Sequence, residues 1–228
     1  MMKFEPMDLP RQRYRHIIWD WNGTLLDDAW LCVEVMNGLL QRRNMAALTA
    51  ERYSEIFGFP IFDYYIKLGF DFSIEPFESV SSEFIAGYES RRSLCPLRAG
   101  STEVIDQLHK MGIGQTIISS SQQNYLEAAV NQLGLNGQFE SLNGLDNHHA
   151  AGKVDIAREW LTRSGVNPAG ILLVGDTLHD LETAQAIGVD CALIFSGHQS
   201  KSRLKTGAAP LVGSLAEILS SSALALSR

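Results

Sequence analysis

Four short apolar runs rich in β-branched residues recur along this chain of 228 residues. They cover residues 16–19, 114–119, 170–174 and 191–195, and amphipathic stretches separate most of them. Strands that alternate with helices form parallel sheets, because two parallel strands need a crossover connection between them. The sequence therefore predicts an α/β fold built on a doubly wound parallel sheet.

Helix start and stop signals support this alternation. Residues 101–112 begin with Ser101 as the expected N-cap, carry Glu103 in the first turn and end at Gly112. Capping side chains and acidic first turns favour the start of a helix, and glycine favours its end. Residues 177–188 show the same pattern and end at Gly188. Both stretches are therefore predicted as helices that connect strands.

The segment after the first run breaks the alternation. It has no convincing strand run, but apolar residues follow helical spacing in residues 28–43, 49–58 and 76–92. We predict a helical cap domain over residues 27–96, inserted into a Rossmann-like core of residues 1–26 and 97–228. Among the aromatic side chains of the cap, Phe59 and Tyr64 are expected to face a ligand.

Charge and composition exclude several classes of protein. A formal net charge of −7 argues against a nucleic-acid surface, which needs clustered lysine and arginine to displace counterions. No apolar run follows the basic residues near the N-terminus, so we expect no signal peptide, no membrane partner and a cytoplasmic location. The cysteines, Cys32, Cys95 and Cys191, lack zinc-ligand and disulfide spacing and are expected to be small buried side chains. The sequence leaves the oligomeric state open.

Polar residues follow the first two apolar runs, at the strand ends where open α/β sheets bind ligands. Asp20 comes directly after the first run, Gly23 permits a sharp loop and Thr24 adds a hydroxyl. Ser119 and Ser120 follow the second core strand, where a hydroxyl and nearby amides can hold a phosphoryl oxygen. The alternative is local hydrogen bonding for the acid and an N-cap role for the serines, Ser121 included.

Three charged residues lie further along the chain. Lys153 opens a predicted helix, where the helix dipole disfavours a cation unless an anion lies nearby. Asp176 follows the third run, and Asp180 lies four residues later. A helix-capping role could explain either aspartate, and the lysine could simply be solvated. Two acids gathered beside Asp20, however, would repel one another without a cation between them.

The combination of "DWNGT", a helical insertion, "SSS", a lysine and "GDTLHD" in this order resembles the haloacid dehalogenase superfamily. Its cap position and "GFP" turn are most similar to phosphoglycolate-phosphatase-type and β-phosphoglucomutase-type members. The resemblance implies hydrolysis of a small phosphorylated metabolite, with Asp20 as the nucleophile and Ser119 and Lys153 holding the phosphoryl group. It also implies Mg²⁺ bound by Asp20, the backbone carbonyl of Asn22 and Asp176, with Asp180 in support.

One residue departs from the pattern of this superfamily's phosphatases. The position two after the nucleophile normally carries an aspartate, which protonates the leaving group and then deprotonates the attacking water. Asn22 can do neither, although its backbone carbonyl is unchanged. The substitution therefore separates metal binding from acid–base catalysis and predicts a slow phosphatase.

Two other functions stay open. One is a phospho-ligand-binding or regulatory module with negligible turnover. The other is a phosphonate hydrolase that would form a Schiff base on Lys67, the only lysine of the predicted cap. His198 is expected to be a loop residue without a role near the site. His148 and His149 are adjacent, but no further ligands accompany them, so they do not predict a metal site.

Overall fold

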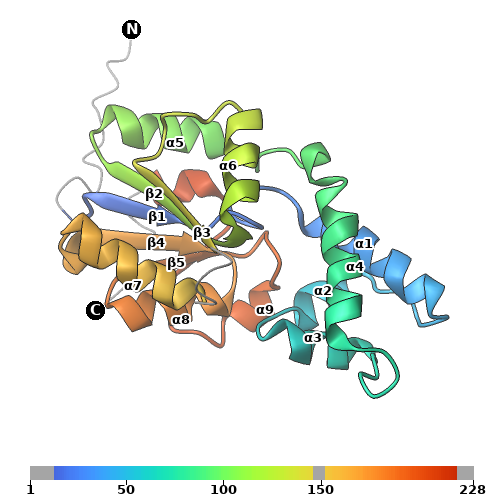
Figure 1. Cartoon of the computed structure of the whole chain (residues 1–228). Coiled ribbons are helices and arrows are strands. Elements are labelled where there is room, and N and C mark those ends of the chain that lie inside the picture. The colour runs from blue at the N-terminus through green and yellow to red at the C-terminus, as the bar shows by residue number, and fades with distance from the viewer. Residues whose placement is uncertain (1–12, 146–151, 220–228) are drawn as a thin grey trace, which may run out of the picture.

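The described strands form one parallel sheet of six, in the order β3-β2-β1-β4-β5-β6 (Figure 1). The structure is a computed structural model that describes residues 13–145 and 152–219. Its strands are β1 (His16–Trp19), β2 (Gly114–Gln122), β3 (Ser141–Leu145), β4 (Ile171–Gly175), β5 (Asp190–Ile194) and β6 (Leu211–Val212). This order reverses between β1 and β4, which is the position where doubly wound sheets bind ligands.

Alternating side chains of the strands form an apolar core on each face of the sheet. Ile17 and Trp19 of β1 face one cluster, which includes residues of α5 (Ser101–Lys110) and α6 (Gln123–Gln132). Ile18 faces the other cluster, with residues of α7 (Lys153–Ser164) and α8 (Leu178–Ile187). Burial of both faces explains why the central strands are continuous apolar runs. Each fully buried aliphatic side chain contributes roughly 1.5–3 kcal/mol.

Four helices between β1 and α5 form the insertion, and we call them the cap helices. They are α1 (Ala29–Arg42), α2 (Ala50–Ile56), α3 (Ile61–Leu68) and α4 (Phe77–Glu89). They lie together beyond one edge of the core in Figure 1, and α1 packs along α4. The α/β fold with an inserted helical cap is thus confirmed. The domain limits at residues 26/27 and 96/97 stay a prediction.

The structure differs from the expected elements in four places. Strands β3 and β6 were not predicted, because β3 is polar with a glycine inside it and β6 has two residues. Helix α3 was not predicted either. The N-cap of α5 is Gly100, with φ of +85°, and the Ser101 hydroxyl donates to the Leu25 carbonyl at 3.2 Å instead. Ser101 therefore ties α5 to the loop after β1 and does not cap the helix.

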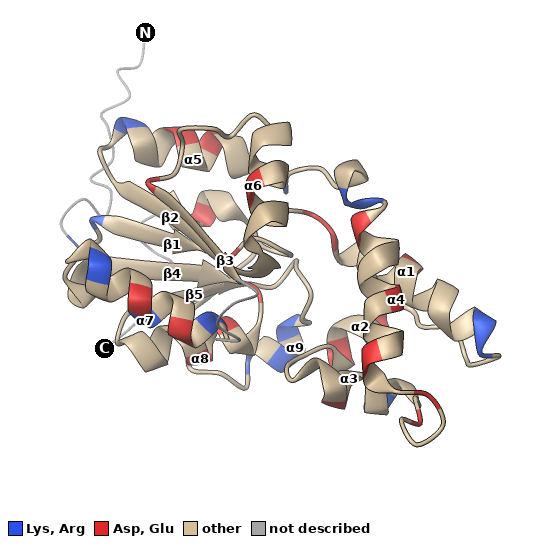
Figure 2. Cartoon of the chain, viewed as in Figure 1, with Lys and Arg blue, Asp and Glu red and all other residues tan. Residues whose placement is uncertain are grey.

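The surface carries charges of both signs. In Figure 2, acidic and basic residues are interspersed along α7, and Arg158 forms an ion pair with Asp155 on this helix. None of the helices in the described ranges is both long and apolar enough to cross a membrane. All three cysteines are buried, as expected.

Candidate active site

Strand register brings the predicted residues to one edge of the sheet. Trp19 pairs with Ile117 of β2 and with Val174 of β4, so the residues that follow emerge side by side. Asp20 comes after β1, and its backbone N–H donates to the Val174 carbonyl at 2.8 Å. Asp176 comes after β4. The two aspartates therefore lie at the carboxyl edge, where the strand order reverses.

Lys153 joins these acids from the first position of α7. Its side chain is 3% exposed, and its Nζ contacts Asp20 Oδ1 and Asp180 Oδ1. Burial alone would lower the lysine pKa, but the charges of Asp180 and Asp20 raise it above its ordinary value. The lysine is therefore protonated although it lies at the positive end of a helix. A solvated lysine, the alternative from the sequence, is excluded.

Three carboxylates gather around this lysine. One oxygen of each of Asp20, Asp176 and Asp180 lies within 4.8 Å of the others, and all three residues are buried. Burial, together with repulsion from neighbouring acids, raises the pKa of Asp20 to about 7 and that of Asp176 to about 6. The Thr24 hydroxyl lies 3.0 Å from Asp20 Oδ2 and 3.3 Å from Asp176 Oδ1. Hard carboxylate oxygens that are crowded in this way fit a divalent cation such as Mg²⁺.

Asp180 is held in place by the start of its own helix. Its Oδ2 accepts a hydrogen bond from the Thr177 backbone N–H at 3.0 Å, and the Thr177 side chain accepts from the Asp180 backbone N–H, so the two residues form a capping box. The Thr177 hydroxyl also donates to Asp180 Oδ2 at 2.7 Å. Burial would raise the pKa of Asp180, but Lys153 and Thr177 hold it below its ordinary value. Asp180 therefore caps its own helix and also lies within the carboxylate cluster, and its support of a metal ion stays a prediction.

Asn22 is fully engaged in hydrogen bonds. Its Nδ2 donates to Asp28 Oδ2 at 2.7 Å and to the Tyr88 hydroxyl at 2.9 Å. Its Oδ1 accepts from the Ser121 hydroxyl at 2.6 Å, so Ser121 belongs to the site and does not cap α6, whose N-cap is Gln122. The Asn22 side chain therefore links the loop after β1 to the end of β2 and to cap helix α4.

Asp28 is a site residue that sequence reasoning missed. It is 1% exposed and accepts hydrogen bonds from the Gly23 backbone N–H at 2.8 Å and the Tyr88 hydroxyl at 2.6 Å. Burial opposes ionisation, but His198 and the hydrogen bonds from Tyr88 and Asn22 hold the pKa of Asp28 below its ordinary value. Its position before α1 suggests an N-cap, yet its side chain makes no cap bond. Only the folded chain shows that Asp28 faces the site.

His198 is the second residue whose environment the sequence does not predict. The expected loop histidine without a role is 4% exposed, and its Nε2 lies 3.3 Å from Asp28 Oδ1. Its Nδ1 lies 2.7 Å from the hydroxyl of Tyr53 on α2, and its backbone N–H donates to Asp176. Burial would lower the histidine pKa, but the charge of Asp28 raises it to about 9. Asp28 and His198 therefore form a buried ion pair beside the carboxylate cluster.

Close packing around Asp176 requires glycine at two positions. Gly23 has φ of +76°, and a Cβ there would lie 2.3 Å from Asp176 Oδ2 and 2.4 Å from His198 Cδ2. A Cβ on Gly197 would lie 2.2 Å from Asp176 Oδ2. Both distances are well inside van der Waals contact. Any larger residue at either position would displace the carboxylate.

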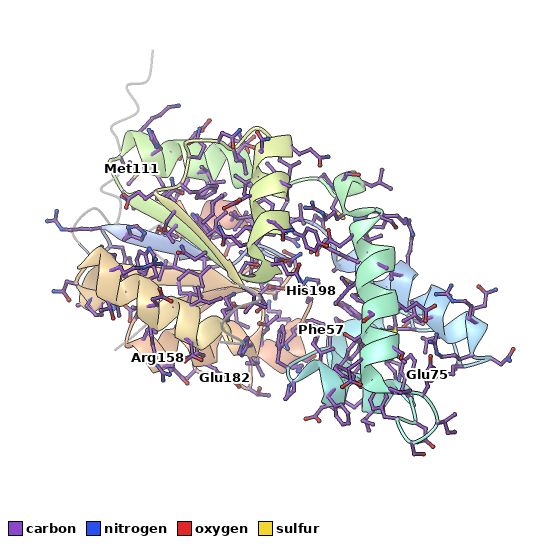
Figure 3. All side chains as sticks on the ribbon, in the orientation of Figure 1. Phe57, Glu75, Met111, Arg158, Glu182 and His198 are labelled. Atoms are coloured by element: carbon purple, nitrogen blue, oxygen red, sulfur yellow. The ribbon has the colours of Figure 1, made fainter. Side chains whose placement is uncertain are left out.

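The site opens into a cavity of about 270 Å³ between the core and the cap helices. Asp20, Asn22, Ser119, Ser120 and Lys153 line it, together with Asp176 and Asp180. Figure 3 shows His198 and Phe57 in this region, and their ring centroids are 5.0 Å apart. The cavity therefore combines the predicted phosphate-binding and metal-binding residues with side chains of the cap.

The cap residues proposed from the sequence divide into two groups. Phe59 lines the cavity and is 41% exposed. Tyr64 is 3% exposed, is packed inside the cap and does not line the cavity. Lys67 is exposed on α3 and is also absent from the lining. His148 and His149 lie outside the described residues.

Comparison with known proteins agrees with this fold. The chain belongs to the family of haloacid dehalogenase-like hydrolases, whose model matches residues 17–194. The tyrosine-protein kinase PtkA of Mycobacterium tuberculosis is 24% identical over 191 residues, which cover 83% of this chain but 65% of that relative. A phosphoglycolate phosphatase of Pseudomonas fluorescens is 26% identical, with coverage of 87% and 75%.

A solved structure gives the same result for the fold. A haloacid dehalogenase-like hydrolase from Streptococcus pneumoniae superposes with a TM-score of 0.78 at 15% identity, covering 90% of this chain and 97% of that one. The likeness supports the fold, and the family model over residues 17–194 confirms the family resemblance expected from the motifs.

Proposed function

We propose that the protein is a Mg²⁺-dependent phosphatase of small phosphomonoesters that works through an aspartyl-phosphate on Asp20. The observation that carries this proposal is the buried cluster of Asp20, Asp176 and Asp180 around Lys153, at the edge of a cavity. Family membership supports it. So do relatives that are phosphatases of small phosphorylated compounds, such as the phosphoglycolate phosphatase of P. fluorescens.

The residues divide into those that hold the cation and those that hold the phosphoryl group. Asp20, Asp176 and the Asn22 backbone carbonyl would bind Mg²⁺, with Asp180 in support. When bound, Mg²⁺ supplies positive charge to the phosphoryl oxygens in the transition state. Lys153 adds the charge of its ammonium group, and Ser119 and Ser120, which line the cavity, offer hydroxyls to the same oxygens. Thr24, expected to join them, is buried outside the cavity lining, and its hydroxyl donates to Asp20 instead.

The reaction proceeds in two displacements. A carboxylate oxygen of Asp20 bonds to phosphorus as the bond to the leaving oxygen breaks, and the electron pair departs with that oxygen. Water then attacks phosphorus, the bond to Asp20 breaks, and inorganic phosphate leaves. Asn22 supplies no proton in the first step and accepts none in the second, because an amide does not titrate. Both steps are therefore slower than with an aspartate at this position.

A binding or regulatory module is the second candidate, and Asn22 is the observation that favours it. Such a protein would keep the cation and the phosphate-binding residues but turn over negligibly. The phosphonate hydrolase has less support, because Lys67 is exposed and does not line the cavity.

The test is phosphate release from a panel of small phosphate esters and acetyl phosphate, with and without Mg²⁺. We expect magnesium-dependent release, and we expect Asp176→Asn to abolish both the dependence and nearly all of the release. Unchanged release from that variant would contradict the site. Magnesium-dependent binding of phosphate without turnover of any compound would favour the binding module.

A further inference from the structure

The cap helices give the cavity an apolar wall. Its members come from α3, α4 and α6 and from the segment between α2 and α3. They are Phe57, Phe59, Ile61, Phe84, Ile85 and Tyr125, and we call them the apolar wall. Phe57 stacks edge-on against Phe59, with centroids 5.8 Å apart. Ile85 is 47% exposed and Phe59 41%, although the burial of either would be favourable. Covering this exposed apolar surface with an apolar ligand would lower the free energy of the complex.

No free cation faces this wall among the described residues that line the cavity. Lys153 is engaged by Asp20 and Asp180, and His198 by Asp28. His179 also lines the cavity, with its ring centroid 4.7 Å from that of Phe59, and its Nδ1 lies 3.2 Å from Glu182. The nearby guanidinium of Arg92 pairs with Glu89 and donates to the Tyr125 carbonyl at 2.7 Å. Glu89 itself lines the cavity and is negative. A second negative charge on a substrate would therefore be buried without a partner, which is costly.

Two further polar groups that line the cavity, one on cap helix α4 and one near the end of β2, are also engaged. The Tyr88 hydroxyl donates to Asp28 and accepts from Asn22, and the Ser121 hydroxyl donates to Asn22. The hydroxyls of a sugar would have to compete with these bonds. A ring without polar substituents would not. The size of the cavity agrees, because an apolar cavity of about 150 Å³ holds one benzene ring, and this cavity is about 270 Å³.

The Asn22 amide leads to the same class of substrate independently of the wall. Without a general acid, the leaving oxygen must depart as an anion. The pKa of a phenol is about 10, as for tyrosine, whereas that of an aliphatic alcohol is far higher and close to that of water. A phenolate is therefore a far better leaving group here than an alkoxide.

We infer that the site takes monophosphate esters of small uncharged phenols, that is, aryl phosphates whose ring lies against the apolar wall. This inference rests on the proposed function and narrows it. The overall reaction converts an aryl phosphate and water to a phenol and inorganic phosphate. Asp20 takes the phosphoryl group as the phenolate leaves, the phenolate gains its proton from solvent, and water releases the phosphate.

The experiment compares four esters that separate ring contact, charge and leaving group. Phenyl phosphate has a neutral ring and a good leaving group, whereas benzyl phosphate has the ring but a poor leaving group. The compound 4-carboxyphenyl phosphate adds a negative charge to the ring, and phosphoglycolate has a negative charge but no ring. We expect kcat/KM for phenyl phosphate to exceed that for benzyl phosphate by about 10²-fold or more. It should exceed that for 4-carboxyphenyl phosphate by about tenfold or more. Phosphoglycolate should be the poorest of the four.

A pair of variants tests the wall itself. Ile85→Lys introduces a cation into the apolar wall and should shift the preference between 4-carboxyphenyl and phenyl phosphate by about tenfold towards the charged ester. Ile66→Lys is the matched control, because Ile66 is 48% exposed on α3 but does not line the cavity. It should leave that ratio unchanged. An unchanged ratio in Ile85→Lys, or a preference of the wild type for either carboxylate ester, would overturn the inference.

Two further measurements separate failure of the inference from failure of the proposed function. Acetyl phosphate has a good leaving group but no ring, so its magnesium-dependent hydrolysis tests the phosphatase alone. Calorimetry with benzylphosphonate and 4-carboxybenzylphosphonate tests the wall without turnover, and we expect benzylphosphonate to bind about tenfold more tightly. Hydrolysis of acetyl phosphate with no preference between the two phosphonates would overturn the inference and keep the phosphatase. Tighter binding of benzylphosphonate without hydrolysis of any compound would overturn the phosphatase and keep the apolar wall as the binding surface for an uncharged ring.

Discussion

The two ends of the cavity are built in different ways. At the sheet edge, Asp20, Lys153 and Asp180 bind one another and are almost completely buried. On the cap side, Phe59 and Ile85 are uncharged and more than 40% exposed, and Phe59 packs against the rings of Phe57 and His179. A change at the sheet edge leaves a buried charge unpaired, whereas a change in the wall alters only what fits beside it. Chemistry is therefore fixed at one end, and selectivity is adjustable at the other.

Loss of the nucleophile is the strongest test of the sheet edge. Asp20→Asn should lower phosphate release from every ester by on the order of 10³–10⁶-fold, because the amide cannot form the aspartyl-phosphate. The measurement is initial phosphate release with Mg²⁺ present. Asp155→Asn, an exposed change on α7, is the control and should keep the wild-type rate. Comparable rates for the two variants would remove Asp20 from the mechanism.

Restoring a carboxylate at position 22 tests whether the asparagine limits catalysis at the sheet edge. Asn22→Asp alone would face Asp28, whose Oδ2 is 2.7 Å from Asn22 Nδ2, so two carboxylates would compete for one proton. The double variant Asn22→Asp/Asp28→Asn avoids this repulsion. It should raise kcat for benzyl phosphate by roughly 10²–10⁴-fold, the usual contribution of a general acid and base. Phenyl phosphate should gain much less.

The single variant Asn22→Asp separates the causes of this gain. It should gain less than the double variant on benzyl phosphate, because one carboxylate of the pair stays protonated. An equal gain would mean that Asp28 does not oppose an acid at position 22. If kcat for benzyl phosphate rises in neither variant, the asparagine at position 22 does not limit catalysis.

Hydrogen bonding of the hydroxyl group distinguishes two tyrosines of the cap, the half-buried Tyr88 and the buried Tyr64. Tyr88→Phe removes the hydroxyl that donates to Asp28, so we expect the free energy of unfolding to fall by about 1.5–3 kcal/mol, as for bonds to charged groups. Tyr64→Phe is the control, because the buried Tyr64 hydroxyl has no hydrogen-bond partner among the described residues. It should be neutral or slightly stabilising. Urea unfolding measures both, and equal losses would contradict the assignment.

The last prediction concerns the pH dependence of stability that arises from the central sheet. His16 begins β1, and burial lowers its pKa to about 4. Between about pH 6.5 and pH 4 the unfolded chain therefore binds a proton that the folded chain excludes, and stability falls as the pH falls. His16→Gln should remove a slope of at most about 1.4 kcal/mol per pH unit in this window. Urea unfolding across the window, with identical slopes for both proteins, would contradict it.

The sequence predicted the sheet edge well, because strand register fixes it. Once β1 and β4 were recognised as parallel strands, Asp20 and Asp176 had to emerge together. Lys153 was recognisable because a cation is unfavourable at a helix start. Asp28 and His198 were not predicted, since their pairing depends on how the cap helices pack onto the core. The apolar wall was missed for the same reason, apart from Phe59.

The hydrogen bonds around Asn22 also govern the chemical ageing of the protein. Asn22 precedes Gly23, and in a flexible chain the glycine nitrogen of such a pair attacks the asparagine side chain, expels ammonia and leaves an aspartate or its isomer. In the fold, the Gly23 N–H donates to Asp28 and to the Leu26 carbonyl, and both ends of the Asn22 amide are bound. Ring closure would have to break these bonds. Deamidation at this pair therefore follows unfolding, and a sample once denatured and refolded carries some chains with an acid at position 22. Mass spectrometry of a peptide that contains residue 22 but no other Asn-Gly pair measures this fraction separately from pairs such as Asn136-Gly137 and Asn143-Gly144.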